Sequence, residues 1–355
     1  MSATILFVDD ENNVLQGLRR SMRTMRKEWD MHFAEGGHAA LAVLAERHVD
    51  VVISDMRMPE MDGAALLEKV AQDYPSTIRF VLSGQADQET TYRAIGPSHQ
   101  FFSKPSDADV LASTIKRLLR VRSALSADEV HIVSGLRCLP SSLSKREEFR
   151  SAITASQPSI ETVSDIISKD VGLSLKTLQL TNSTYFGVGA DVYCARHAAR
   201  MLDVGVLSDL VAQKRFSVPL LHEANDAGFT ALGDAGLYLA EVTGRIAEKR
   251  GLSLDDCSLA SIAALFSTIK KLLTLTEHGG GIDATSDSVI AYMLALWGMP
   301  SALIDVFDAA VEDNEMSRTV RAMISEAMNE QPVAEHPPKA PSCKSTEDYI
   351  PALVS

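Results

Sequence analysis

Five polar residues follow short apolar runs in the N-terminal part of the chain: Asp9, Asp10, Asp55, Ser83 and Lys104. Three clustered carboxylates repel one another unless a hard divalent cation that prefers oxygen ligands offsets their charge, and Mg²⁺ is the most plausible choice. A carboxylate held beside such a cation and an ammonium group can attack a phosphoryl donor and form an acyl phosphate. Its position among these residues makes Asp55 the predicted nucleophile.

The elements that must position these residues follow an α/β pattern. Apolar runs of strand length alternate with helical patterns, at residues 5–8, 31–33, 51–53, 78–82 and 100–102. Continuously apolar runs are typical of parallel strands that helices bury on both faces. The carboxyl ends of such strands form one edge of the sheet, so we expect the five polar residues to lie together there. A last helix follows Pro105, with Ser106 or Asp107 as its cap.

Four motifs around these residues resemble the receiver domain of two-component response regulators. They are Phe7-Val8-Asp9-Asp10-Glu11, Ser54-Asp55-Met56-Arg57-Met58-Pro59-Glu60-Met61-Asp62-Gly63, Leu82-Ser83-Gly84 and Phe102-Ser103-Lys104-Pro105. The resemblance covers essentially all of residues 1–122 and implies a flavodoxin-like, doubly wound fold with five parallel strands. It also implies a cognate histidine kinase or phosphotransfer protein as a partner.

The same resemblance implies a metal site. Asp10 and Asp55 would ligate Mg²⁺ directly, Asp9 through a water molecule, and Arg57 through its backbone carbonyl. Asp55 would accept the phosphoryl group, which would make the chain a phosphoprotein.

The resemblance also implies a response to phosphorylation. Ser83 would hydrogen-bond the phosphoryl group, while Lys104 would neutralise its charge. Phe101, three residues before the lysine, would rotate inward as the switch residue, and the Lys104–Pro105 peptide bond would be cis.

Each of these residues also has an ordinary structural interpretation. An Asp-Asp pair is often a helix cap, Lys-Pro a loop, Ser-Gly a turn and Phe101 a core aromatic residue. The joint occurrence of these residues after correctly ordered strands favours the phosphoacceptor site.

Composition bounds the rest of the chain. With 355 residues, of which 46% are hydrophobic, the chain exceeds what one core usually organises, so we expect two domains. We find neither a secretory signal nor a run of ~18 apolar residues, and we expect a cytoplasmic protein without a membrane partner. The predicted boundaries are a receiver at 1–122, a linker at 123–129, a helical domain at 130–330 and a flexible tail at 331–355.

The second domain is predicted to be all-helical. Apolar residues recur at i, i+3 and i+4 over residues 160–167, 174–180, 237–249 and 258–275. Its motifs resemble the HDOD domain: Leu139-Pro140-Ser141-Ser142-Leu143, the stretches 166–176 and 180–187, and Ala295-Leu296-Trp297-Gly298-Met299-Pro300. The resemblance covers roughly residues 130–325.

An enzyme is one alternative, because HDOD domains are similar to HD-type metal-dependent phosphohydrolases and phosphodiesterases. That chemistry requires a His-Asp pair and further His ligands. The best matching segment reads Leu265-Phe266-Ser267-Thr268-Ile269, without a His-Asp pair. The histidines are scattered, at His131, His197, His222 and His278, and the four cysteines lack metal-site spacing. We therefore expect no metal in this domain and no enzyme activity beyond the receiver's own phosphorylation and dephosphorylation.

A DNA-binding transcriptional regulator is the other alternative, because residues 161–183 have the length of a helix-turn-helix. Its second helix carries only Lys176 as a cation. Residues 1–122 contain 15 Lys and Arg against 17 Asp and Glu, which leaves 19 against 30, a net −11, for the remainder. Such an acidic surface opposes nucleic-acid binding.

The expected output is therefore a protein–protein contact. The HDOD domain would bind and regulate a downstream signalling protein, and analogy with receiver–HDOD proteins suggests cyclic-dinucleotide signalling among the candidates. The leucines at 173, 175, 178 and 180, with Tyr185 and Phe186 after them, would be mostly core, with a partner groove as an alternative. A homo-oligomer is compatible with the sequence.

Overall fold

The computed structural model describes most of the chain, in two compact units. The described residues are 2–84, 92–105, 107–183, 191–212, 216, 226–276, 279–311 and 314–330. The first unit is formed mainly by residues 1–137, and the second by most of the residues from 138 onward. Helix α6, Ala127–Gly135, lies in the first unit, although the sequence-based boundaries, which stay predictions, begin the second domain at residue 130.

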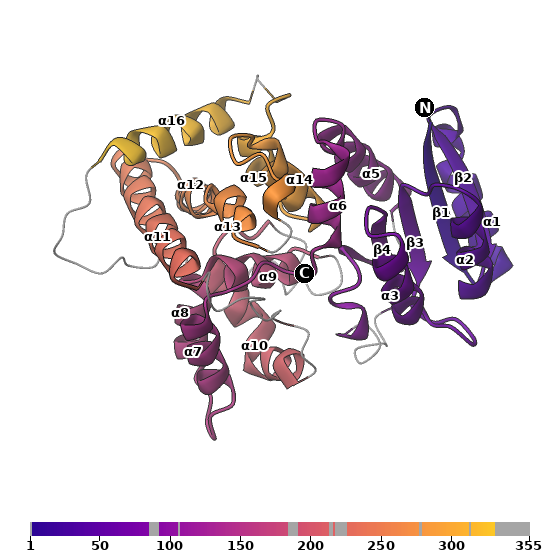
Figure 1. The fold of residues 1–355 in the computed structure, drawn as a ribbon, viewed down its shortest axis with the longest axis horizontal. Coiled ribbons are helices and arrows are strands. Elements are labelled where there is room, and N and C mark those ends of the chain that lie inside the picture. The colour runs from indigo at the N-terminus through magenta and orange to yellow at the C-terminus, as the bar shows by residue number, and fades with distance from the viewer. Residues whose placement is uncertain are drawn as a thin grey trace. The chain divides into compact units, whose positions relative to one another are not determined.

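A parallel sheet of five strands organises the first unit (Figure 1). The strand order is β2-β1-β3-β4-β5, which is the doubly wound order with a switch point between β1 and β3. The strands are β1 Ala3–Asp9, β2 Trp29–Glu35, β3 Val51–Asp55, β4 Ile78–Ser83 and β5 Gln100–Ser103. All five predicted apolar runs are strands, and every residue of β3 and β4 is buried, as expected of a sheet covered on both faces.

Helices pack against this sheet. They are α1 Asn12–Ser21, the 3-10 helix η1 Met22–Lys27, α2 Gly37–Glu46, α3 Gly63–Asp73, α5 Ala108–Arg122 and α6. Asp107 caps α5, because its side chain accepts a hydrogen bond from the amide of Asp109 (2.8 Å). The other predicted cap, Ser106, lies outside the described residues. The α/β prediction is confirmed.

The second unit is helical throughout its described residues. Its elements are α7 Leu143–Ile153, α8 Ile160–Ser168, α9 Val171–Thr181, α10 Ala195–Ala212, α11 Asp226–Lys249, α12 Leu254–Phe266, α13 Ile269–Thr274, η3 Gly279–Gly281, α14 Ser288–Leu296, α15 Ser301–Phe307 and α16 Glu315–Asn329. The predicted all-helical class is confirmed. Residues 331–355, predicted to be a flexible tail, lie outside the described residues.

Two helices form the centre of this unit. Every residue of α9 is buried, and so is every residue of α12 from Cys257 to Phe266. The stretch Leu254–Thr274 is apolar enough to pass as a membrane span, but 78% of its most apolar window is buried, as in a core helix. Because α9 exposes no face, its leucines are core and do not form the alternative partner groove. Tyr185 and Phe186, the other residues of that prediction, lie outside the described residues.

Candidate functional site

The carboxyl ends of the parallel strands bring the predicted site residues to one edge of the first sheet. Asp9 ends β1, Asp55 ends β3 and Ser83 ends β4, while Lys104 follows β5. Asp9 is 1% exposed and Asp55 is 7% exposed, whereas Asp10 is exposed. Two buried carboxylates therefore lie at the edge where the sequence predicted a phosphoryl-transfer site.

Lys104 joins these two carboxylates. Its Nζ lies 2.8 Å from Oδ2 of Asp9 and 2.5 Å from Oδ1 of Asp55. Burial alone would lower the pKa of Lys104, but the hydrogen bonds to Asp55 and Asp9 outweigh burial and raise it. The ammonium group therefore stays charged and offsets part of the negative charge of the pair.

Asp55 is held on both oxygens. Its second oxygen, Oδ2, accepts a hydrogen bond from the amide of Arg57 (2.9 Å). Burial raises the pKa of Asp55; the hydrogen bond from Lys104 opposes this effect, and the charge of Asp9 adds to it. A Cβ at Gly63 would overlap the main-chain carbonyl of Asp55, so only glycine lets the start of α3 approach this strand end.

Ser83 and Phe101 lie on the neighbouring strands. Ser83 is fully buried and pairs in register with Ser103 of β5, while its Oγ donates a 3.3 Å hydrogen bond to the carbonyl of Gly84. Phe101 pairs in register with Val81 and is 2% exposed, so its ring is packed inside the unit. The residues that follow Gly84, 85–91, lie outside the described part of the chain. The Lys104–Pro105 peptide bond is cis, as expected.

The donor set fits a magnesium ion by its chemistry. Asp9 and Asp55 supply buried carboxylate oxygens of the kind that Mg²⁺ prefers. Among the described residues, no three His, Cys, Asp or Glu side chains converge closely enough to hold a metal by themselves. The metal roles of Asp9, Asp10, Asp55 and the Arg57 carbonyl therefore stay predictions.

A second feature of the first unit escaped the sequence-based prediction. Arg79, the second residue of β4, is fully buried, and its guanidinium donates hydrogen bonds to four main-chain carbonyls. They belong to Pro97 (2.6 Å), Pro75 (3.0 Å), Thr77 (2.8 Å) and Ser134 (2.7 Å). Because Ser134 belongs to α6, Arg79 attaches this helix to the sheet. The sequence does contain one sign of this buried role, because a charged residue interrupts the apolar run of residues 78–82.

His99 supports the same attachment from the residue before β5. Its Nδ1 accepts a hydrogen bond from the amide of Arg79 (3.0 Å). Its Nε2 lies 3.0 Å from the Ser134 carbonyl and 2.8 Å from Nη2 of Arg79. Arg79 and His99 thus meet at one carbonyl of α6.

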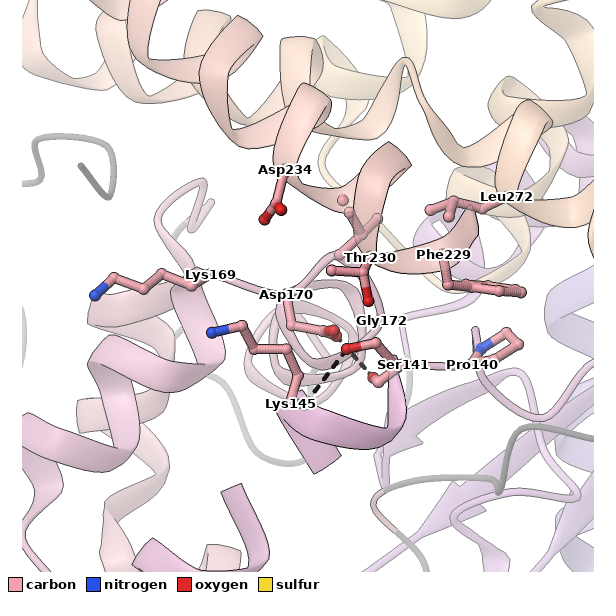
Figure 2. Close-up of a pocket in the computed structure, with 13 residues that line it drawn as sticks. Pro140, Ser141, Lys145, Lys169, Asp170, Gly172, Phe229, Thr230, Asp234 and Leu272 are labelled. Atoms are coloured by element: carbon pink, nitrogen blue, oxygen red, sulfur yellow. Dashed lines mark hydrogen bonds between the residues drawn. The ribbon is translucent and has the colours of Figure 1, made fainter. Parts of the chain in front are cut away.

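The first two HDOD-like motifs meet around a small pocket of the second unit (Figure 2). Ser141 donates a 2.7 Å hydrogen bond to Asp170, which caps α9 by accepting from the amide of Leu173 (2.8 Å). Burial raises the pKa of Asp170, and these hydrogen bonds partly offset the effect. A Cβ at Gly172 would lie 2.8 Å from the carbonyl oxygen of Leu139. Both motifs are thus explained by the close packing of α9.

This pocket offers little room for a ligand. Figure 2 shows Lys145 and Lys169 extending to the same side of Asp170, while Asp234 of α11 lies across from them. The pocket encloses about 30 Å³, which is enough for about one water molecule. Its residues therefore have a structural role in joining α7, α9 and α11.

The segment that would hold a His-Asp pair in an HD enzyme lies between α12 and α13. The Ser267 hydroxyl donates to the carbonyl of Ala264 (2.7 Å) and the Thr268 hydroxyl donates to that of Leu265 (2.8 Å). Both side chains thus satisfy local main-chain groups. His131 is exposed and His197 is buried in α10, whereas His222 and His278 lie outside the described residues.

Comparison with known proteins identifies both halves of the chain. Residues 5–116 match the family model of the response regulator receiver domain, and residues 139–280 match that of the HDOD domain. The regulatory protein AtoC of Escherichia coli (strain K12) is 34% identical over 120 residues, which are 34% of this chain and 26% of AtoC. The sensor kinase CckA of Brucella abortus (strain 2308) is 34% identical over 33% of this chain and 13% of CckA. The chain thus spans about a quarter or less of these relatives.

A solved structure gives a similar match. The signal receiver domain of an HD domain-containing protein from Pseudomonas fluorescens Pf-5 is 35% identical, and the match covers 35% of this chain and all of that domain, with a TM-score of 0.33.

Proposed function

This chain carries a response regulator receiver domain followed by an HDOD domain, and we propose that it is a phosphorylation-dependent regulator in two-component signal transduction. Asp55 accepts a phosphoryl group from a histidine kinase or phosphotransfer protein. The HDOD domain then binds and regulates a downstream signalling protein. The observation that carries this proposal is the pair of buried carboxylates, Asp9 and Asp55, joined by Lys104 at the carboxyl edge of the sheet.

The chemistry follows from the positions of these groups. An oxygen of Asp55 attacks the phosphorus of the donor, the bond to the leaving group breaks, and an acyl phosphate forms. Lys104, already within 2.5 Å of Asp55, neutralises negative charge that spreads over the phosphoryl oxygens. A bound Mg²⁺, held by Asp9, Asp10, Asp55 and the Arg57 carbonyl, would supply further neutralisation. Ser83 then hydrogen-bonds the phosphoryl group.

The signal reaches the output through strands β4 and β5. Ser83 and Arg79 lie four residues apart on β4, so they point to the same face of the sheet. Phe101 lies in β5 and His99 stands two residues before it, so their side chains also point to one face of the sheet. A shift of Ser83 and Phe101 toward a phosphoryl group therefore acts on the strands that hold α6, the helix that precedes the HDOD domain.

The output is a non-catalytic protein contact. This proposal is supported by the segment that best matches the His-Asp pair of a phosphohydrolase, where Ser267 and Thr268 donate to local main-chain carbonyls. Lys176, the single cation of α9, is 1% exposed, so that helix cannot present it to DNA. We place the protein in the cytoplasm, and by analogy an enzyme of cyclic-dinucleotide signalling is one candidate partner.

Phosphorylation with a small phosphodonor tests the acceptor assignment. The protein is incubated with acetyl phosphate and Mg²⁺, and intact-mass measurement follows a gain of one phosphoryl group per chain. Asp55→Asn is expected to abolish this gain. Asp73→Asn, at the exposed end of α3, serves as the matched control and is expected to be labelled like wild type. Normal labelling of Asp55→Asn would refute the assignment.

A further inference from the structure

The first unit carries a concentrated run of positive charge. Residues 12–27 contain five cations and no Asp or Glu, although the chain as a whole has a formal net charge of −13. The cations are Arg19 and Arg20 at the end of α1 and Arg23, Arg26 and Lys27 in η1. All five side chains are exposed. We refer to these five residues as the basic patch.

The fold places the basic patch at the amino edge of the sheet. Helix α1 returns from the carboxyl end of β1, and η1 leads into β2, which begins at Trp29. η1 packs against β2 and α5, and Lys116 of α5 pairs with Glu28, the residue after η1 (3.0 Å). The length of the strands therefore separates the basic patch from the carboxyl edge, where Asp55 lies.

The 3-10 geometry of η1 sorts its side chains into a buried row and an exposed row. Side chains three residues apart eclipse one another in a 3-10 helix. Met22 is 1% exposed and Met25 is half-buried, so this pair faces the unit, whereas Arg23 and Arg26 form an outer row. Arg20 precedes Arg23 by the same three residues. At a rise of about 2.0 Å per residue, the positions of Arg23 and Arg26 are about 6 Å apart along η1.

The charge of this surface is not balanced within the described part of the chain. The guanidinium of Arg19 lies over the ring of Phe33, 4.5 Å from its centroid. The other four cations of the basic patch have neither an ion pair nor a side-chain hydrogen bond among the described residues. The dipole of α1 favours the cations in its last turn, Arg19 and Arg20, but the cations of η1 repel them. An anionic partner would relieve this repulsion.

The surroundings of the basic patch distinguish between classes of anionic partner. A stable membrane contact needs apolar side chains beside the charges, but the exposed large apolar side chains of the described chain, Val110, Leu254 and Met328, lie outside α1 and η1. Single-stranded nucleic acid needs an open aromatic ring for stacking, and Arg19 occupies that of Phe33. The net charge of −13 opposes a long polyanion such as duplex DNA. These observations favour an acidic protein surface.

Spacing and residue type select an acidic helix. Carboxylates four residues apart on an α-helix are about 6 Å apart along its axis, from a rise of about 1.5 Å per residue. This is the spacing of Arg23 and Arg26 along η1. Four of the five cations are arginines, and the planar guanidinium binds a carboxylate through two parallel hydrogen bonds. A helix with carboxylates at i and i+4 therefore matches the outer row in both distance and chemistry.

From these observations we propose that the basic patch is a docking site for an acidic α-helix of another protein, with carboxylates at i and i+4 paired with Arg23 and Arg26. Arg20 receives a carboxylate from the adjacent turn of the same helix. The contact leaves the carboxyl edge of the sheet open, so the partner binds before and after phosphorylation of Asp55. The inference goes beyond the function proposed above and does not depend on it.

Two synthetic helical peptides of identical composition test the match in spacing. Both are rich in alanine and carry glutamates, which recur at i, i+4 and i+8 on one face of the first peptide and are spread around the helix in the second. Each peptide is fluorescently labelled and titrated with the protein at low ionic strength, and anisotropy reports binding. We expect the one-face peptide to bind roughly threefold more tightly, and added salt to weaken its binding. Equal affinities of the two peptides, or no binding of either, overturn the proposal.

Removal of charge then locates the contact. Arg23→Gln/Arg26→Gln is expected to weaken binding of the one-face peptide by roughly threefold to tenfold, as for the loss of two exposed ion pairs. Arg245→Gln/Arg318→Gln removes the same charge from exposed positions of α11 and α16 and should leave the affinity unchanged. Equal weakening by the two double substitutions overturns the proposal, because the effect would then reflect net charge alone.

Two further arms test the other classes of anionic partner. Wild-type protein is titrated with a labelled DNA duplex and with phosphatidylserine vesicles under the same conditions. Both are expected to bind more weakly than the one-face peptide, and tighter binding of either one overturns the assignment to an acidic helix. Labelling by acetyl phosphate should be the same in wild type and Arg23→Gln/Arg26→Gln, which keeps this test separate from that of the phosphoacceptor.

Discussion

The guanidinium of Arg79 donates a 2.7 Å hydrogen bond to the main-chain carbonyl of Ser134. Arg79 lies near the start of β4, and Ser134 lies near the end of α6, the helix that follows the last helix of the α/β fold. A fully buried cation thus satisfies a carbonyl near the end of a helix. The bond holds the segment that leads into the HDOD domain on the strand that ends at Ser83.

Arg79→Met should release this segment. The substitution leaves the carbonyls of Pro75, Thr77, Pro97 and Ser134 without the guanidinium, and each unsatisfied buried acceptor costs about 1–3 kcal/mol, partly relieved by local rearrangement. We expect a loss of about 3 kcal/mol in the free energy of unfolding of the receiver. Hydrogen exchange of the α6 amides should accelerate in parallel.

Arg23→Met is the matched control for this experiment. Arg23 is exposed in η1, and its replacement should change the free energy of unfolding by no more than about 0.5 kcal/mol. Unchanged exchange in α6 of the Arg79→Met variant would mean that other contacts hold the helix.

Lys104→Met should slow phosphorylation of Asp55. The variant keeps both carboxylates but removes the ammonium that lies 2.8 Å from Asp9 and 2.5 Å from Asp55. Loss of one preorganised charge at a reacting centre typically lowers a rate by about 10²–10³. We expect such a decrease in the initial rate of labelling by acetyl phosphate, measured by intact mass. Lys116→Met, which removes an exposed lysine paired with Glu28, should retain the wild-type rate.

Much of the receiver could be predicted because its signals are local. Apolar runs identify buried parallel strands, and the residue after each run must lie at the carboxyl edge, which is where Asp9, Asp55 and Lys104 meet. Arg79 was missed because its partners are main-chain carbonyls from separate segments, which side-chain identities do not reveal. The exposure of Asp10 likewise depends on the conformation of the loop that follows β1.

In the second unit the helices could be predicted but their burial could not. Lys176 has the position of an ordinary helix-surface cation, yet it is 1% exposed and its Nζ donates to Oε1 of Gln179 (2.8 Å). Periodicity failed here because α9 is surrounded on all sides, so no polar face exists. A groove between α11, α15 and α16 also arises from helices far apart in the sequence.

The buried Lys176 gives the second unit a defined pH dependence. Burial lowers its pKa from 10.5 to about 8, so between these values the folded state binds fewer protons than the unfolded state. Stability should therefore rise as the pH increases from about 8 to 10.5, by roughly 3 kcal/mol at 1.36 kcal/mol per pKa unit. Urea unfolding of wild type and Lys176→Met at pH 7.5 and 10 measures this difference. An equal pH dependence in both proteins would show that Lys176 does not titrate in this way.

Gly172→Ala should destabilise the second unit although alanine is the better helix former. A Cβ at this position would lie 2.8 Å from the carbonyl oxygen of Leu139 and 2.9 Å from that of Pro140, so the turn that carries Ser141 must move away from α9. Overpacking of this kind costs about 1–3 kcal/mol, more than the helix propensity returns. Gly233→Ala in α11, where a Cβ meets nothing within 4 Å, should instead stabilise the protein by about 0.5–1 kcal/mol. Urea unfolding separates the two effects, and stabilisation by both substitutions would mean that the Ser141–Asp170 contact tolerates more space than its 2.7 Å hydrogen bond indicates.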